Sequence, residues 1–294
     1  MRILHTADWH LGRSLHGQPL LEDQAFILDQ FVALVSELKP DVVLVAGDVY
    51  DRAVPPSEAV SLLDEILSRI LIRHRTPVVL IPGNHDSPER LTFASKLLAA
   101  ENLHLYRRFT PDNVITVADG HGTVDIYSVP FAEPPVARME LQSEAIVDHN
   151  TAVQAIVERI RSGRVAGRRS VLLTHAFVAG GIASESERPL TVGAVGAVEP
   201  AGLAGFSYVA LGHLHRPQSA GQDHIQYAGS ILPYSFGEAS HCKSVNLVEI
   251  DPWGTCKVER VPLRPLHAVR CVEGMFEDLR RGAAAGEDPN DYLM

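Results

Sequence analysis

The sequence predicts an α/β fold with a layered sheet core, and three observations lead to this prediction. Apolar runs rich in Val, Ile and Leu alternate with helical patterns along most of the chain, which is typical of strands joined by helices. The later apolar runs have no helical pattern between them, which predicts antiparallel strands. The chain has 294 residues, 46% of them hydrophobic, so it can bury a sizeable core.

The alternating part contains the expected strands 2–6, 42–46, 78–81, 124–129, 171–174 and 208–211. Helical patterns between them cover residues 21–38, 57–73, 88–100 and 150–162. Pro55 and Pro56 mark the start of the second helix, because proline is favoured in a first helical turn. The segments 225–228, 245–250, 256–261 and 267–272 are expected as later strands.

Residues 1–263 are predicted to form one domain, with Pro262 and Pro265 framing a linker to another. Beyond the linker we expect a strand at 267–272, a short helix at 276–281 and the start of a further strand at 291–294. A domain of about 30 residues has too little surface to bury its own core. Residues 267–294 are therefore expected to be the start of a truncated domain.

Composition excludes several classes of protein. A net charge of −10 argues against a protein that coats nucleic acid with a general positive field. No run approaches the ~18 apolar residues of a membrane span, and the N-terminus has no apolar signal core, so we expect a cytoplasmic protein without a membrane partner. The three cysteines are too few and too widely spaced for a disulfide framework, and we expect buried apolar roles for Cys242, Cys256 and Cys271.

Acids, histidines and one amide gather directly after five of the predicted strands. They are Asp8 and His10, the pairs Gly47-Asp48 and Asp51-Arg52, the run Gly83-Asn84-His85-Asp86, His175, and the pair His213 and His215. Each short motif alone is common in turns or on surfaces. Their joint placement at carboxyl ends of strands, where α/β folds bind ligands, predicts one shared site.

The residue types in this set indicate metal binding. Asp8 and His10 lie two positions apart, so on a strand end both would point to one face, and His213 and His215 repeat that spacing. Asp48 offers a carboxylate that can bridge two cations, Asn84 an amide oxygen and His175 a further imidazole. Mixed oxygen and nitrogen donors without a thiolate favour Mn²⁺, Fe or Zn²⁺ over Ca²⁺, with Mg²⁺ a poorer candidate.

Together these motifs resemble those of the calcineurin-like metallophosphoesterases. The runs 4–13, 210–216 and 227–230, the last followed by Ser235-Phe236, are similar to the DNA-repair nucleases of that family. The resemblance implies a four-layer α/β/β/α metallophosphoesterase sandwich, followed by an incomplete α+β capping domain. It also implies two Mn²⁺ ions, DNA as substrate, a two-fold homodimer through helices of the N-terminal half, and an ATPase partner bound by a C-terminal tail that is absent here.

The resemblance also implies roles at the site. Asp48 would bridge two cations and so favour a bridging hydroxide. One ion would be held by Asp8, His10 and His215, and the other by Asn84, His175 and His213. His85 would give a proton or hydrogen bond to a phosphate oxygen, with its tautomer fixed by Asp51 or by Asp86. Family analogy favours Asp51, although a histidine stands at that position in archaeal and eukaryotic relatives.

Three residues beyond the metal motifs are candidates for contact with the DNA backbone. Arg52 is the best placed, followed by Arg13 and His16, whereas Trp9 is expected to pack in the core. A phosphomonoesterase or a cyclic-nucleotide phosphodiesterase on the same centre is the alternative, because the groove and cap select the substrate rather than the ligands. A scaffold that had lost its chemistry would lack ligands, and none of the seven is missing.

Overall fold

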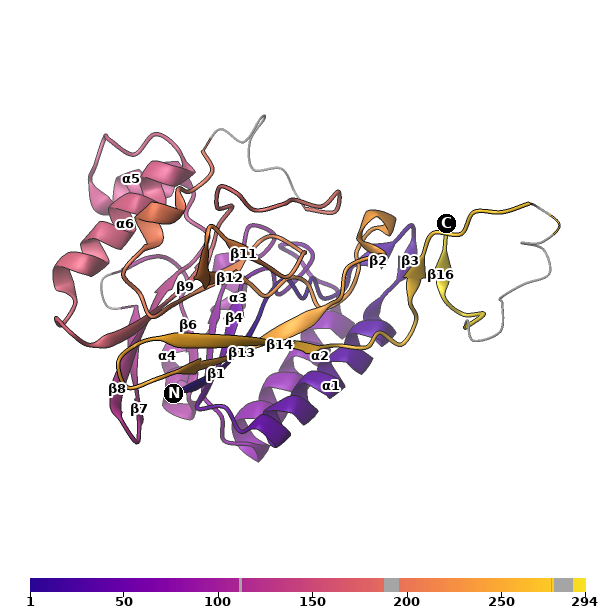
Figure 1. Cartoon of the computed structure of the whole chain (residues 1–294), viewed down its shortest axis with the longest axis horizontal. Coiled ribbons are helices and arrows are strands. Elements are labelled where there is room, and N and C mark those ends of the chain that lie inside the picture. The colour runs from indigo at the N-terminus through magenta and orange to yellow at the C-terminus, as the bar shows by residue number, and fades with distance from the viewer. Residues whose placement is uncertain (111–112, 188–195, 276, 278–287) are drawn as a thin grey trace.

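The computed structural model describes residues 1–110, 113–187, 196–275, 277 and 288–294. Two six-stranded sheets pack face to face, with helices outside each of them (Figure 1). The helices α1 (Leu21–Leu38) and α2 (Ser57–Ser68) cover the first sheet, and α5 (Pro134–Leu141) and α6 (His149–Gly163) lie over the second. The four-layer α/β/β/α prediction is therefore confirmed.

The first sheet has the strand order β14-β13-β1-β4-β5-β6. Four strands run parallel, and they are β1 (Arg2–Thr6), β4 (Val42–Ala46), β5 (Val78–Ile81) and β6 (Leu103–Leu105). Two antiparallel strands extend the sheet beyond β1, namely β13 (Ser244–Ile250) and β14 (Cys256–Pro262). The parallel strands direct the loops after β1, β4 and β5 to the same edge.

The second sheet has the strand order β11-β12-β10-β9-β8-β7. Its parallel strands are β8 (Gly122–Val129), β9 (Arg169–His175), β10 (Tyr208–Gly212) and β12 (Gln222–Tyr227). The antiparallel edge strands are β7 (Val114–Asp119) and β11 (Gln218–Ala220). The segment 225–228 was expected to be an antiparallel strand, but its residues 225–227 belong to β12, which pairs with β10 in parallel. The chain leaves β10, reverses direction in β11 and reverses again, so that β12 runs in the same direction as β10.

Short elements complete the fold. They are the ribbon of β2 (Ser14–Leu15) and β3 (Gln18–Pro19), α3 (Pro88–Leu91), α4 (Ser95–Leu98), a π-helical turn η1 (Arg69–Arg73), and the 3-10 turns η2 (Ala99–Glu101), η4 (Pro200–Leu203) and η5 (Phe236–Glu238). The helix predicted at 88–100 is interrupted, because Ala94 adopts left-handed backbone with φ 58°. The predicted helix at 57–73 is α2 continued by η1.

Each central strand is buried on both faces, as parallel sheets under helices require. In β4, Val43 and Val45 pack toward α1 and α2, while Val42 and Leu44 pack between the sheets. The cysteine expectation is wrong, since Cys242 and Cys271 are exposed and Cys256 is only half-buried. Across the described ranges, we find no helix with both the length and the apolar character needed to cross a bilayer.

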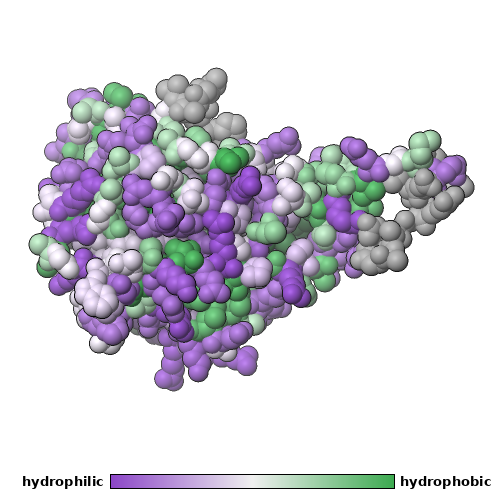
Figure 2. Space-filling view, in the orientation of Figure 1, coloured by the Kyte–Doolittle hydropathy of each residue, from purple (hydrophilic) through white to green (hydrophobic). Residues whose placement is uncertain are grey.

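After residue 263 the chain forms a small parallel pair, β15 (Val269–Arg270) and β16 (Tyr292–Leu293). The predicted strand at 291–294 is thus present, whereas the predicted helix at 276–281 lies outside the described residues. Asp23 of α1 ties the pair to the first domain, because it accepts hydrogen bonds from the His267 amide at 3.2 Å and the Tyr292 hydroxyl at 2.9 Å. Apolar surface is visible around this pair in Figure 2.

The two sheets approach each other closely where β10 ends. A Cβ on Gly212 would lie 1.8 Å from the carbonyl oxygen of Ala46. We therefore expect Gly212→Ala to lower the free energy of unfolding by about 3 kcal/mol, because backbone rather than a flexible side chain must move. Gly163→Ala is the matched control, since its Cβ would meet nothing within 4 Å. Equal urea midpoints for the two variants would contradict the close approach.

Candidate metal centre

The loops after β1 and β4 run side by side and carry the first donors. The Asp8 amide donates to the Gly47 carbonyl at 3.0 Å, and the His10 amide donates to the Asp48 carbonyl at 2.9 Å. Asp8, His10 and Asp48 all have left-handed backbone, with φ of 52°, 46° and 49°. The prediction that strand alternation points Asp8 and His10 to one face is therefore wrong, because both residues lie beyond the strand. Their left-handed backbone conformation costs energy in residues other than glycine.

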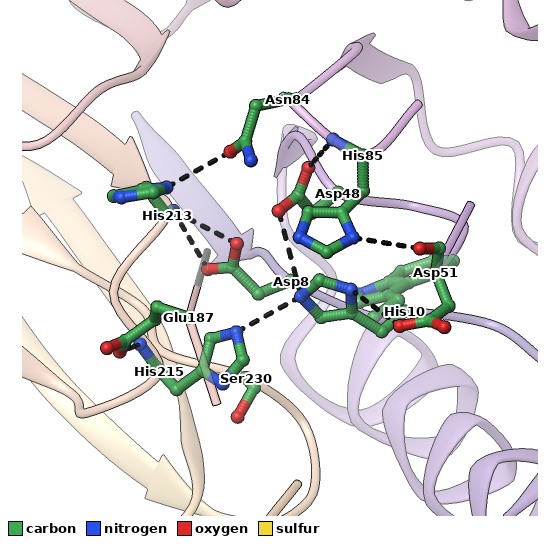
Figure 3. A network of polar contacts seen from close by, with 12 residues as sticks. Asp8, His10, Asp48, Asp51, Asn84, His85, Glu187, His213, His215 and Ser230 are labelled. Carbon is green, nitrogen blue, oxygen red and sulfur yellow. Dashed lines mark hydrogen bonds and ion pairs between the residues drawn. The ribbon is translucent and has the colours of Figure 1, made fainter. Parts of the chain in front are cut away.

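The first donor group joins the two sheets at Asp8, His10 and His215 (Figure 3). Their ligand atoms lie within 4.8 Å of one another, and the Nε2 atoms of His10 and His215 are 3.1 Å apart. Asp8 accepts the amide of His213 at 3.0 Å, which fixes the carboxylate across the gap between the sheets. All three side chains are buried.

The second donor group contains Asn84, His175 and His213. The Asn84 Oδ1 lies 2.9 Å from His175 Nε2 and 3.1 Å from His213 Nδ1. Asp48 lies between the groups, with Oδ2 3.6 Å from His175 Nε2 and 3.7 Å from His10 Nε2. The structure therefore brings all seven predicted ligands together and puts Asp48 in the central position.

The electrostatics of this cluster fit divalent cations. Burial lowers the pKa of His175 and of His215 to about 4, so both imidazoles are neutral near pH 7, as ligands must be. Burial and the charge of Asp48 raise the pKa of Asp8 well above its ordinary value. The cluster contains buried carboxylates, imidazole nitrogens whose lone pairs face each other, and an amide oxygen. These electron-rich atoms repel one another, and a bound cation would relieve the repulsion.

Hydrogen bonds on the outer side orient two of the imidazoles. His175 Nδ1 lies 2.8 Å from the Ala46 carbonyl, and this oxygen can only accept, so Nδ1 carries the hydrogen and Nε2 the lone pair. His215 Nδ1 lies 3.1 Å from Glu238 Oε1, a carboxylate oxygen. Metal-binding histidines are usually held in this way through their second nitrogen.

His85 lies beside the donor groups and contacts Asp51, one of the two predicted partners, through the main chain. Its amide donates to Asp48 Oδ1 at 2.9 Å, and its Nδ1 lies 2.8 Å from the main-chain carbonyl of Asp51. The tautomer is thus set by backbone and not by a carboxylate. Asp86 has no part in this contact, because its oxygens accept the amides of Val49, Tyr50 and Gly83. Burial and the charge of Asp48 raise the pKa of Asp86 to about 7.

The Asp51 carboxylate faces Arg13 and His10. Its Oδ1 lies 3.1 Å from Arg13 Nη1 and 3.5 Å from His10 Nδ1. Burial alone would raise the pKa of Asp51, but the hydrogen bond with His10 and the charge of Arg13 outweigh it and lower the pKa. Arg13 therefore contacts the centre through Asp51, whereas the side chains of Arg52 and His16 are exposed. Trp9 is fully buried, as predicted, 5.9 Å from the Phe31 ring.

Sequence patterns missed several polar residues at the centre. Glu187 accepts the His215 amide at 2.6 Å, and burial raises its pKa to about 7. Glu238 and Lys243 form a buried ion pair behind His215. No spacing in the sequence links these residues to the histidines, since they come from distant loops. The only available signal was that Glu238 and Lys243 follow closely on the Ser235-Phe236 run.

The layered fold and its buried donor cluster define a metal-dependent phosphoesterase, a hydrolase that uses divalent cations. Residues 1–217 match the model of the calcineurin-like phosphoesterase family, and the chain belongs to that family. A relative from Staphylococcus epidermidis, named as a subunit of the nuclease SbcCD, is 37% identical over 293 residues, which cover 100% of this chain and 78% of the relative. The crystal structure of TT1561 from Thermus thermophilus matches with a TM-score of 0.50 and 14% identity over 88% of this chain and 98% of that one, which supports the fold alone.

The buried imidazoles predict a pH-dependent stability in protein freed of metal by a chelator. The pKa of His175 is about 4 in the folded chain and about 6.5 when unfolded, so between these values the unfolded state binds more protons. The contribution of His175 to the free energy of unfolding therefore increases as the pH rises through this range. We expect the difference between wild type and His175→Gln, measured by urea unfolding, to rise from pH 4 to pH 6.5 and then level off. A difference that is constant with pH would contradict the shift.

Proposed function

We propose that this chain is a two-metal DNA nuclease that hydrolyses phosphodiesters, as an exonuclease on double-stranded ends and an endonuclease on single strands. The proposed setting is DNA repair and recombination together with an SbcC-type ATPase. The observation that carries the proposal is the position of Asp48 between His10 of one donor group and His175 of the other. The likeness, over the whole of this chain, to a protein named as a nuclease subunit favours DNA over smaller phosphoesters.

The proposed cofactor is a pair of Mn²⁺ ions, with Mg²⁺, Fe or Zn²⁺ as alternatives. Asp8, His10 and His215 would hold one ion, Asn84, His175 and His213 the other, and Asp48 both. When bound, such a pair supplies Lewis-acid activation of water and neutralises charge on the phosphate. The protein contributes a buried cluster whose imidazoles are already neutral and oriented.

His85 is the proposed general acid. The Asp51 carbonyl holds Nδ1–H whether the ring is neutral or charged, so Nε2 remains available to donate to the leaving oxygen when the ring is protonated. The His85 amide is bonded to Asp48, which ties the ring's position to the central carboxylate. Asp51 thus acts on His85 through its main chain in this proposal.

The proposed DNA path passes over the exposed rim of the centre. Arg13, Arg52 and His16 are the proposed contacts with the DNA backbone. The half-buried Phe131 and Phe177 lie 6.1 Å from His175 and 6.2 Å from His213 between ring centroids. A cavity of about 220 Å³ is lined by Asn84, Phe131 and Arg107 among others. Aromatic rings beside cationic groups suit unstacked bases next to phosphates.

The net charge of −10 sets a condition on this proposal. Bound cations and the arginines at the rim would be the main local attraction for phosphates, so binding by the chain alone should be weak and steeply salt-dependent. An ATPase partner would add further surface for binding DNA.

The proposal also includes the division of the chain into a nuclease domain at 1–263 and the start of a capping domain at 267–294.

The proposed homodimer has a suitable surface on the first helical layer. Val60, Ile72, Phe93 and Leu97 are exposed by 45%, 77%, 80% and 76%. Val60, Ile72 and Phe93 line an apolar groove between α2 and the α3–α4 region, and Leu97 lies on α4 next to Leu98, which also lines it. Such a patch on a helical face is typical of a subunit interface.

We expect Phe93→Asp to convert a dimer to a monomer, because a buried charge would be placed in the apolar contact. Analytical ultracentrifugation measures this directly. Trp253→Asp is the control, since Trp253 is 87% exposed on the turn between β13 and β14. A wild-type chain that sediments as a monomer at high concentration would rule out this interface.

Single substitutions separate the proposed acid from the proposed ligands. We expect His85→Ala to lower DNA cleavage by roughly 10²- to 10⁴-fold while Mn²⁺ content stays near that of wild type. Asp48→Ala should lower both, because it removes the shared anion. Metal content is measured by elemental analysis after gel filtration. Wild-type cleavage by His85→Ala, or full metal content in Asp48→Ala, would contradict the assigned roles.

Substrate choice decides between the nuclease and the alternative. Purified protein with Mn²⁺ is offered labelled single- and double-stranded DNA, a cyclic nucleotide and p-nitrophenyl phosphate in parallel. We expect cleavage of DNA, abolished by chelator and restored by Mn²⁺. Turnover of only the small phosphoesters would favour the phosphomonoesterase or cyclic-nucleotide phosphodiesterase.

A further inference from the structure

The acceptor of His215, Glu238, belongs to a buried polar group whose other members, Lys243 and Ser230, have no role in the function described so far. Glu238 is completely buried, and Lys243 and Ser230 are buried with it. Lys243 Nζ forms an ion pair with Glu238 and donates to the Ser230 hydroxyl at 2.8 Å and to the His215 carbonyl at 2.9 Å. The three residues come from the stretch 227–243, whose first part carries the family resemblance but no predicted ligand.

The hydrogen bonds of this group specify the tautomer of His215. Its Nδ1 lies 3.1 Å from Glu238 Oε1 and 2.6 Å from the Ser186 hydroxyl oxygen. The Ser186 hydroxyl in turn donates its hydrogen to Glu238. Because neither oxygen has a hydrogen left for the ring, Nδ1 must donate. The lone pair is then on Nε2, the atom that faces His10.

The same pair fixes both the ring and the main chain of His215. Glu238 holds the ring at Nδ1, and Lys243 holds the carbonyl, while Glu187 accepts the amide. Lys243 forms a buried ion pair with Glu238, so Glu238 is a carboxylate with Lys243 as its counter-ion.

A buried ion pair is poor evidence for added stability, since apolar residues of similar volume often serve the fold as well or better. The presence of this ion pair therefore needs another reason, and its contacts with His215 provide one. The pair adds no net charge to a centre that must hold cations. It does add a fixed acceptor for one particular ring nitrogen.

We propose that Glu238 and Lys243 are a positioning pair that holds His215 with Nε2 directed at the metal centre. This inference rests on the proposed function, in which His215 is a ligand. Neither residue touches substrate or the reacting atoms. Loss of the pair should loosen the orientation of His215 and so weaken cation binding, with an expected loss of about 10- to 100-fold in affinity.

The experiment compares Glu238→Gln, Lys243→Met and the double variant in the full chain. Each single variant leaves a partner unpaired in the interior and is expected to be less stable, whereas the double variant removes both charges and should recover stability. Mn²⁺ affinity is measured by titration calorimetry on protein freed of metal, and stability by urea unfolding. For a positioning pair, affinity stays about 10- to 100-fold low in the double variant even where stability recovers.

A second buried ion pair, whose acid also contacts the N-terminal ammonium, provides a control away from the donor groups. Asp119 and Arg169 lie at 2.6 Å with side chains exposed by 8% and 6%, between β7 and β9 and away from His215. The double variant Asp119→Asn/Arg169→Met should leave Mn²⁺ affinity unchanged. Wild-type affinity in the Glu238→Gln/Lys243→Met protein would overturn the proposal and leave the pair a purely structural one.

His215→Ala separates failure of this proposal from failure of the proposed function. If His215→Ala weakens Mn²⁺ binding and the double variant does not, His215 is a ligand and only the positioning role is wrong. If His215→Ala itself binds Mn²⁺ as wild type does, the ligand assignment is wrong and the positioning role fails with it.

Discussion

The close contact between the carboxyl ends of two sheets is the constraint on which the rest of the structure depends. The end of β4 meets the end of β10 so closely that position 212 admits only glycine beside the Ala46 carbonyl. This contact brings Asp8 and Asp48 from the first sheet against His175, His213 and His215 from the second. Each of the two donor groups described above draws residues from both sheets, so these groups form only because the sheets are packed.

Packing the sheets together buries several carboxylates near one another, which is electrostatically unfavourable. The surrounding hydrogen bonds hold these carboxylates in place. Asp8, Asp48 and Asp86 are buried near one another, and burial with mutual repulsion raises the pKa of Asp8 and Asp86. The Asp86 oxygens accept three amides, which fixes the loops after β4 and β5. The fold thus holds carboxylates together in a geometry that a divalent cation stabilises, which links folding of the site to metal binding.

Much of this could be predicted from the sequence, because strand periodicity and polar residues at strand ends are local signals. Such signals predicted the positions of the seven donors and of the strands β1, β4, β9 and β10. The left-handed backbone of Asp8 and His10 could not be predicted, since it results from hydrogen bonds to the neighbouring loop. Glu187, Glu238 and Lys243 were missed for a related reason, because their roles arise from contacts between segments far apart in the chain.

The contact between His85 and position 51 shows how a site can tolerate variation beside a fixed residue. The prediction named Asp51 or Asp86 as the residue that fixes the His85 tautomer. The main-chain carbonyl of Asp51 makes that contact at 2.8 Å, and a carbonyl is present whatever the side chain at this position. The carboxylate instead bonds to Arg13 and faces His10. The contact that orients His85 therefore does not depend on the side chain at position 51, whereas the charge beside Arg13 does.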